Sequence, residues 1–338
     1  MSNNMKSLYG KAKDSYALKI KLKSGILLLW FIILTIICLL PIYVLVINAT
    51  RSHTDISNGL SFVPSTYLKS NFDKVLHEPV FKFAFNIFHG YKNSLFITCC
   101  STFLTVFFSA LTAYGIHVYD FKLKEISYTV ILLVMMVPMQ VTSAGFVKFM
   151  TDIKLTNTYW PLIIPAIAAP AVVYFMRSYM KSSFPLDIVV AARIDGSGEF
   201  RTFLSIAIPM MKPAIAVQAI FAFIASWNNF YNPNMILINV SLKKKTLPMM
   251  VSSLSSSDKF NDYGTIYLAI ALSIIPIIIA YVALSRFIIA GVALNTGLAF
   301  LVHFLNLPLF LDTAGTIGIS AIGGAFPGIA VAMLTNVF

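Results

Sequence analysis

Six uncharged, apolar segments constrain the fold of this chain more than any other feature of its sequence. They cover residues 25–48, 94–117, 126–147, 155–176, 213–232 and 263–285. Each is long enough to cross the hydrocarbon core of a bilayer, which takes about 20 helical residues. Lipid offers no partners for backbone N–H and C=O groups, so each segment must be helical. The sequence therefore predicts an all-α protein, a polytopic transmembrane helix bundle with six core spans.

Composition indicates that lipid, rather than water, surrounds much of the chain. It is 58% hydrophobic, only 11% charged, and has a mean hydropathy of +0.81. A soluble domain could not bury that much apolar surface. The net charge of +12 does not indicate nucleic-acid binding, because no basic face alternates with stacking aromatic residues. We expect membrane lipid as a partner and no nucleic acid.

The distribution of lysine and arginine predicts the orientation. Residues 1–24 form a basic segment with six lysines just before the first apolar segment. With the N-terminus in the cytoplasm, 14 lysines and arginines lie inside and 11 outside, which is the bias of a cytoplasmic N-terminus. The run Lys243–Lys245 falls on the outer side and opposes this bias. The loop at 178–212 is then cytoplasmic.

This cytoplasmic loop is charged and punctuated by glycine. Pro185 is suited to start a short helix, with Asp187 in the first turn, where the helix dipole favours a negative charge. Gly196 or Gly198 could end that helix with a positive φ. The segment 199–208 then continues as an amphipathic piece along the membrane surface. On these grounds alone, a docking surface for another protein and a solvated loop remain equally open.

A spacing pattern within the loop resembles the EAA loop of ABC-importer permeases. That loop reads Glu-Ala-Ala, three residues, Gly, nine residues, Ile-x-Leu-Pro. The positions that match at the same spacings are Ala191, Ala192, Gly196, Ile206 and Pro209. Asp195 matches the Asp-Gly pair that is common in the carbohydrate-uptake branch.

Other segments extend this resemblance over about residues 15–297. They are residues 60–64, 71–76, 93–95, 137–138, 157–158, 227–230 and 246–248. The chain thus looks like the smaller, maltose-type permease subunit of a carbohydrate importer. The resemblance implies a permease domain of the type I ABC-importer kind at 25–297, preceded by the segment 1–24. Residues 298–338 form an atypical apolar tail, which is either an extra span or a fragment of another membrane module.

The resemblance also implies a mode of action. In such permeases the cytoplasmic loop docks on a nucleotide-binding ATPase subunit and couples ATP hydrolysis to transport. The implied coupling residues are Val190, Ala191, Ala192, Asp195, Gly196, Ile206 and Pro209. The implied partners are a second permease subunit, two copies of the ATPase subunit, an extracytoplasmic solute-binding protein and the carbohydrate itself. The implied location is the bacterial inner membrane.

No enzymatic chemistry is indicated by the sequence. It contains no Gly-x-x-x-x-Gly-Lys-Ser/Thr phosphate-binding motif, and no nucleophile–base or metal-ligand pattern is evident. We therefore expect no cofactor, no metal and no catalytic residue in this chain. ATP hydrolysis would belong to the partner subunit.

Two substitutions within the loop depart from the family pattern. Val190 stands where the family has glutamate, and Ile208 stands where it has leucine. The first removes a carboxylate that could accept hydrogen bonds at a subunit interface. Together with the atypical tail, Val190 suggests an alternative function, a membrane sensor or scaffold that keeps a permease-like bundle without transport.

Two further features have alternative interpretations. The amides in Trp227-Asn228-Asn229 either line the translocation pathway or hydrogen-bond to neighbouring helices. Residues 49–93 form a long polar-aromatic segment between the first two spans. This segment is either an extracytoplasmic cap that meets a partner or a passive linker.

Overall fold

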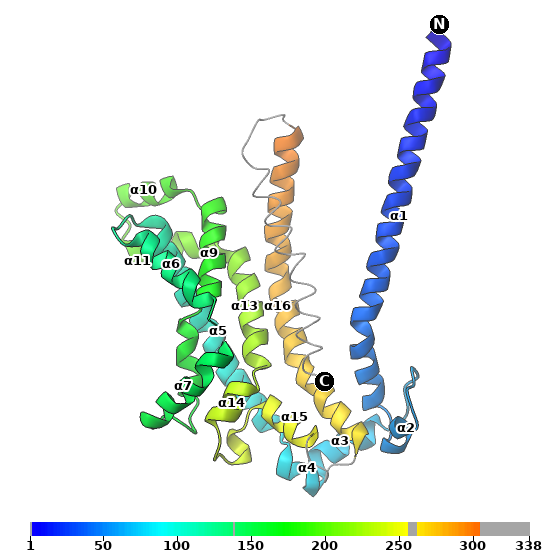
Figure 1. The fold of residues 1–338 in the computed structure, drawn as a ribbon, viewed down its shortest axis with the longest axis vertical. Coiled ribbons are helices and arrows are strands. Elements are labelled where there is room, and N and C mark those ends of the chain that lie inside the picture. Colours follow the sequence, from blue (N-terminus) through cyan, green and yellow to red (C-terminus); the bar gives the residue numbers. More distant parts are fainter. Residues whose placement is uncertain (1, 138, 256–261, 305–338) are drawn as a thin grey trace.

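The computed structural model describes residues 2–137, 139–255 and 262–304 (Figure 1). Every regular element among these residues is a helix, and they contain no strand. The predicted all-α class is therefore confirmed. Four helical stretches are long and apolar enough to cross a membrane: Gly25–Ala49, Ile87–Val118, Trp160–Ser183 and Tyr263–Leu284. A bent pair, Glu199–Met210 with Lys212–Trp227, would count as a fifth if it forms one span.

Three long helices agree with predicted spans. The first is α1 (Ser2–Ala49), which joins the basic segment to the first span without a break. The second is α5 (Ile87–Val118), which begins seven residues before the predicted span because the side chain of Asn86 caps the N–H of His89 at 3.1 Å. The third is α16 (Tyr263–Phe304). It runs past residue 297, where the permease domain was expected to end, and residues 305–338 lie outside the described part of the chain.

The third predicted span, 126–147, is not one continuous helix. It consists of α6 (Lys124–Met135) and α7 (Met139–Asp152), each shorter than a span. The break directly precedes the proline at position 138, and the residue before a proline is disfavoured in the helical conformation. Two separate helices replace the single span that the uncharged, apolar length predicted.

Prolines also shape the fourth predicted span. It is built from α8 (Trp160–Ile163), the 3-10 helix η1 (Ile164–Ile167) and α9 (Pro170–Ser183). A proline occupies the first turn of each piece, where its missing N–H is not needed for a helical hydrogen bond. The fifth predicted span corresponds to α13 (Lys212–Trp227), which ends five residues early at the C-cap Asn228.

Short helices form the two ends of the bundle. One end holds α10 (Leu186–Ile194), α11 (Glu199–Thr202), the π-helix η2 (Phe203–Ala207) and α12 (Ile208–Met210). The other holds α2 (His53–Ser57), α3 (Leu68–His77), α4 (Pro79–Ala84), α14 (Tyr231–Ile236), η3 (Leu242–Lys244) and α15 (Leu247–Ser255). Figure 1 places the N-terminal end of α1 and the helix α10 at the same end of the molecule.

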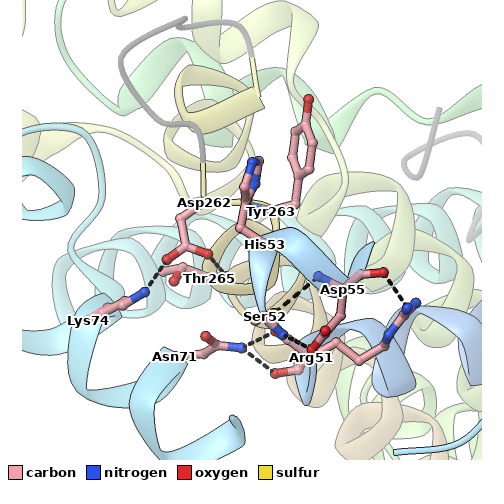
Figure 2. Close-up of polar contacts among 10 residues, drawn as sticks. Arg51, Ser52, His53, Asp55, Asn71, Lys74, Asp262, Tyr263 and Thr265 are labelled. Atoms are coloured by element: carbon pink, nitrogen blue, oxygen red, sulfur yellow. Dashed lines mark hydrogen bonds and ion pairs between the residues drawn. The ribbon is translucent and has the colours of Figure 1, made fainter. Parts of the chain in front are cut away.

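Residues 50–86, which hold α2, α3 and α4, pack on the ends of α1 and α16, and we call them the cap. Asn71 of α3 is buried, and its side-chain amide donates to the backbone carbonyls of Ala49 and Arg51, both at 2.9 Å (Figure 2). Lys74 pairs with Asp262, which lies just before α16. These contacts join the end of α1, the cap and the start of α16.

Two main apolar cores stabilise the bundle. One lies toward the cap, where α13, α15 and α16 pack with the end of α4; its buried residues include Phe85, Trp227, Leu247 and Met250. The other lies toward α10, where α5, α9 and η2 bury residues that include Tyr114, Met176, Met180 and Phe203. The apolar side chains of α1 between residues 26 and 40 remain largely exposed, as expected for a helix that faces lipid or another subunit.

Candidate coupling site

The helix α10 forms where the sequence predicted a short helix. Pro185 is its N-cap, and Asp187 lies in its first turn. Val189 and Ala192, three residues apart, are 1% and 6% exposed and pack inward. The small side chain of Ala192 therefore fits this helix against its own chain. It is Ala191 that lies on the exposed side.

The outward side of α10 carries an exposed apolar stripe. Leu186, Val190 and Ile194 are 46%, 50% and 81% exposed, respectively. Residues four apart lie above one another on one helix face, so these three side chains form a continuous row, which we call the α10 stripe. Val190 lies at the middle of this row.

Gly196 ends α10. Its φ of 78° lies in the left-handed region, which glycine adopts without the penalty of a Cβ. The N–H of Gly196 donates to the carbonyl of Arg193 at 3.0 Å, and the N–H of Ser197 donates to that of Ala192 at 2.9 Å. This pair of hydrogen bonds is a Schellman motif. Of the two glycines considered from the sequence, Gly198 does not serve this purpose, because its φ is −69°.

A polar cluster joins α10 to the neighbouring elements. Arg193, in the last turn of α10, donates from Nε to Glu199 Oε1 at 2.7 Å and from Nη2 to Oε2 at 3.3 Å. The hydroxyl of Tyr119, which directly follows α5, donates to Glu199 Oε2 at 2.7 Å. Burial and this hydrogen bond raise the pKa of Tyr119 to about 12, so its hydroxyl keeps its proton at neutral pH.

An aromatic layer lies beneath this part of the chain. The ring of Phe203 in η2 meets the ring of Tyr114 in α5, with centroids 5.3 Å apart. Tyr114 also makes an edge contact with Phe184, which connects α9 to α10, at 6.2 Å. Rings at these separations attract one another beyond the effect of their buried area. The layer fixes the base of the loop on α5.

The remaining predicted coupling residues lie at or beyond the turn that ends α10. Asp195 is the exposed C-cap residue. Ile206 is half-buried and packs against the apolar core toward α10, whereas Pro209 is exposed in the first turn of α12. The segment Glu199–Met210 meets α13 at 81°. That angle fits a segment that runs along the membrane surface before the next span begins.

Trp227, Asn228 and Asn229 lie at the opposite end of α13, about 24 Å from the loop at the usual helical rise. Trp227 is buried, and its Nε1–H donates to the carbonyl of Ser273 in α16 at 3.0 Å. Asn229 accepts from the N–H of Asn232 at 3.2 Å. The adjoining cavity is only about 20 Å³, room for roughly one water molecule. The contacts of Trp227 are those of helix packing.

Sequence reasoning missed Glu199 and Tyr119. The opposite charges of Arg193 and Glu199, six residues apart, were a weak local signal. Tyr119 had none, because 80 residues separate it from Glu199. The buried Arg177 was also missed; its guanidinium lies 3.6 Å from the ring centroid of Tyr128.

Comparison with known proteins decides the family. Residues 101–294, more than half of the chain, match the family described as binding-protein-dependent transport system inner membrane component. The chain belongs to this family. The match includes the loop with α10, both helices that flank it and Tyr119. This membership, together with the apolar helices, makes the chain an integral inner-membrane protein.

Named relatives cover most of this permease. The arabinooligosaccharides transport system permease protein AraQ of Bacillus subtilis is 33% identical over 274 residues, which is 80% of this chain and 94% of AraQ. AraQ of Halalkalibacterium halodurans is 30% identical over 80% of this chain and 95% of its own length. The trehalose/maltose transport system permease protein MalG of Thermococcus litoralis is 29% identical over 80% of this chain and 95% of its own length.

A solved structure confirms the fold of the permease. It is the crystal structure of a bacterial ABC transporter involved in the import of the acidic polysaccharide alginate. One of its chains aligns with a TM-score of 0.66, at 20% identity, over 79% of this chain and 96% of that chain. The expected ABC-importer permease fold is therefore present.

Proposed function

We propose that this chain is a permease subunit of an ABC importer for carbohydrate uptake, forming half of the transmembrane pathway. A single observation carries the coupling part of this proposal. The α10 stripe, Leu186, Val190 and Ile194, exposes three large apolar side chains on a short helix whose end is fixed by a Schellman motif. Apolar side chains held on a rigid helix are typical of a docking surface.

The stripe would dock on a nucleotide-binding ATPase subunit. Closure of two such subunits around ATP would then move α10, and the chain offers two routes from α10 into the bundle. One passes through the aromatic layer and the Tyr119–Glu199 contact to α5, which packs against α9 and α13. The other passes along α11, η2 and α12 to the bend at the start of α13. Both routes lead to α5 and α13, which contribute residues to both apolar cores.

The orientation in the membrane follows from the same placement. The N-terminal end of α1 and the helix α10 share one end of the molecule (Figure 1), and the basic segment 1–24 precedes the first span. We place this end in the cytoplasm, in keeping with the lysine bias. The cap then faces outward, where a solute-binding protein would deliver the substrate.

We infer the substrate class and the remaining partners from the named relatives. Their names specify arabinooligosaccharides, lactose and trehalose or maltose, all of which are carbohydrates. The complex would hold this chain, a second permease subunit and two copies of the ATPase subunit. The cavity beside Trp227 and Asn229 holds roughly one water molecule. That cavity is too small for a sugar, so the passage does not run through it.

The alternative, a sensor or scaffold without transport, rests on Val190. Its place in the middle of the α10 stripe weakens that alternative. A valine there extends the apolar surface, whereas a carboxylate would interrupt it. The substitution therefore alters the chemistry of the contact without removing the contact.

Reconstitution in vesicles tests the proposal. The chain would be purified together with a candidate partner permease, ATPase subunit and binding protein. The vesicles would be given radiolabelled arabinotriose, maltose or lactose. We expect one loaded binding protein to stimulate ATP hydrolysis and the labelled sugar to accumulate. Assembly of the complete complex with neither response to any sugar would favour the scaffold alternative.

A further inference from the structure

Glu199 connects three elements of the coupling site. It is the first residue of α11, and it accepts hydrogen bonds from Arg193 at the end of α10 and from Tyr119 at the end of α5. Arg193 engages both carboxylate oxygens, at 2.7 and 3.3 Å, and Tyr119 engages Oε2 at 2.7 Å. The Arg193 guanidinium also lies 5.8 Å from the centroid of the Tyr119 ring. We call these three side chains the Glu199 clasp.

We propose that Glu199 is a positioning residue for coupling, which fixes the orientation of α10 relative to α5 so that movement of α10 is passed on to α5. This inference rests on the proposed function, because it assigns a role within the same site. Glu199 lies outside the alanine–glycine–proline spacing that defines the loop in the family.

The clasp adds directionality that the apolar contacts lack. The aromatic layer of Tyr114, Phe184 and Phe203 holds the base of the loop, but apolar contacts allow sliding and rotation. A carboxylate that receives a guanidinium fork and a hydroxyl fixes an orientation, since charge-assisted hydrogen bonds are directional and short. Gly196 fixes the backbone path between the two halves of the loop, and the clasp fixes the angle between them.

The clasp does not replace the missing family glutamate. Both oxygens of Glu199 already have partners within this chain, whereas Val190 points outward in the α10 stripe. The one carboxylate of α11 therefore serves the internal geometry of the loop, and the docking face remains apolar.

The clasp contributes little to the stability of the fold. About two fifths of the Arg193 side chain and nearly half of the Glu199 side chain are exposed, at 41% and 46%. Ion pairs exposed to this extent are weak. Removal of Glu199 should therefore loosen the loop without unfolding the permease. This distinguishes a positioning residue from one that only stabilises the fold.

The first test measures amide hydrogen exchange in the purified permease in lipid nanodiscs. Glu199→Ala and Tyr119→Phe are compared with Asp152→Asn, which removes another exposed ion pair, Lys148–Asp152 in α7. We expect Glu199→Ala to accelerate exchange several-fold across residues 194–202, Tyr119→Phe to do so less, and Asp152→Asn to have no effect there. Unchanged exchange in Glu199→Ala would overturn the proposal.

The second test measures sugar molecules transported per ATP hydrolysed in the reconstituted complex, with the sugar that stimulates hydrolysis in the wild type. We expect Glu199→Ala to lower this ratio several-fold while hydrolysis continues, and Glu199→Gln to lower it less, because the amide oxygen can still accept from Tyr119. Adding Tyr119→Phe to Glu199→Ala should change nothing further, as expected for residues that act through one contact.

The outcomes separate the two proposals. An unchanged ratio in Glu199→Ala, in a wild-type complex that transports, overturns the clasp and leaves the proposed function in place. A fully assembled wild-type complex that transports no sugar counts against the proposed function. The exchange measurement, which needs no substrate, then still decides whether the clasp orders the loop.

Discussion

The backbone N–H of Ser197 donates to the carbonyl of Ala192 at 2.9 Å, and this hydrogen bond closes α10 around Gly196. A β-branched residue at position 196 would have to adopt the left-handed conformation, at a cost of about 1–2 kcal/mol. We expect Gly196→Val to lower the number of sugar molecules transported per ATP, with the protein still inserted in the membrane. Gly196→Asn should be milder, because asparagine tolerates this conformation. Equal coupling in Gly196→Val and the wild type would contradict the assignment of this turn.

The α10 stripe leads to a prediction about binding of the proposed ATPase subunit. Burying a side chain as large as isoleucine contributes about 1.5–3 kcal/mol. Ile194→Asp should therefore weaken binding of the ATPase subunit roughly tenfold to a hundredfold, as measured by titration in nanodiscs. Ile238→Asp is the matched control, because Ile238 is also exposed but follows α14 at the opposite end of the bundle. A comparable loss in both variants would exclude a specific role for the stripe.

Restoring a glutamate at position 190 tests whether the partner surface opposite the α10 stripe is apolar. If the partner surface is apolar opposite the stripe, Val190→Glu places an uncompensated charge in the contact, which is costly. We expect Val190→Glu to weaken binding of the ATPase subunit by about 1–3 kcal/mol, and Val190→Ile to preserve it. Tighter binding of Val190→Glu would instead mean that the partner retains a site for the family carboxylate.

At the junction between the cap and α16, replacing a glycine by alanine should cost more stability than the same change in α5. A Cβ on Gly264 would lie 2.3 Å from the carbonyl oxygen of Arg51 and 2.8 Å from the amide nitrogen of Asn71. Gly264→Ala should therefore destabilise the protein by about 1–3 kcal/mol, the usual cost of overpacking. Gly115→Ala should be neutral or stabilising, because nothing lies within 4 Å of its added Cβ, and alanine favours the helix. Thermal unfolding in detergent measures the melting temperatures of both variants. Equal melting temperatures for Gly264→Ala and Gly115→Ala would contradict the close contact of Gly264 with Arg51 and Asn71.

The ion pair at the same junction predicts a pH dependence. Burial alone would raise the pKa of Asp262, but its contacts with Lys74 and Thr265 outweigh burial and hold that pKa below its usual value. A carboxylate with a lowered pKa stabilises the fold above its unfolded pKa of about 3.9, and that contribution is lost as the pH falls through the folded pKa. Asp262→Asn should therefore lower the melting temperature at pH 7, and its difference from the wild type should shrink as the pH falls below about 4. A constant difference down to pH 3 would argue against the ion pair.

Local sequence signals predicted the parts of the structure that depend on local physics. Pro185 marked the start of α10, and its end was narrowed to Gly196 or Gly198, because each residue type favours one backbone conformation there. Apolar length located the first span to within one residue of its observed end. The carbohydrate-importer family, inferred from the loop spacing, agrees with the comparisons.

The sequence did not show what depends on contacts between distant segments. The buried side chain of Asn71 gave no signal, since its partners are backbone carbonyls about 20 residues away. Similarly, the alanines of the loop gave no sign that Ala192 faces inward while Ala191 is exposed.

Photo-crosslinking tests the central claim, that the α10 stripe is the surface that meets the ATPase subunit. A photoreactive amino acid replaces Ile194 in one variant and Ile238 in another, and membranes that contain the whole transporter are irradiated. The account predicts a crosslinked product of this permease and the ATPase subunit from position 194 and none from position 238. A crosslink to the ATPase subunit from position 238, with none from position 194, would contradict both the docking surface and the orientation.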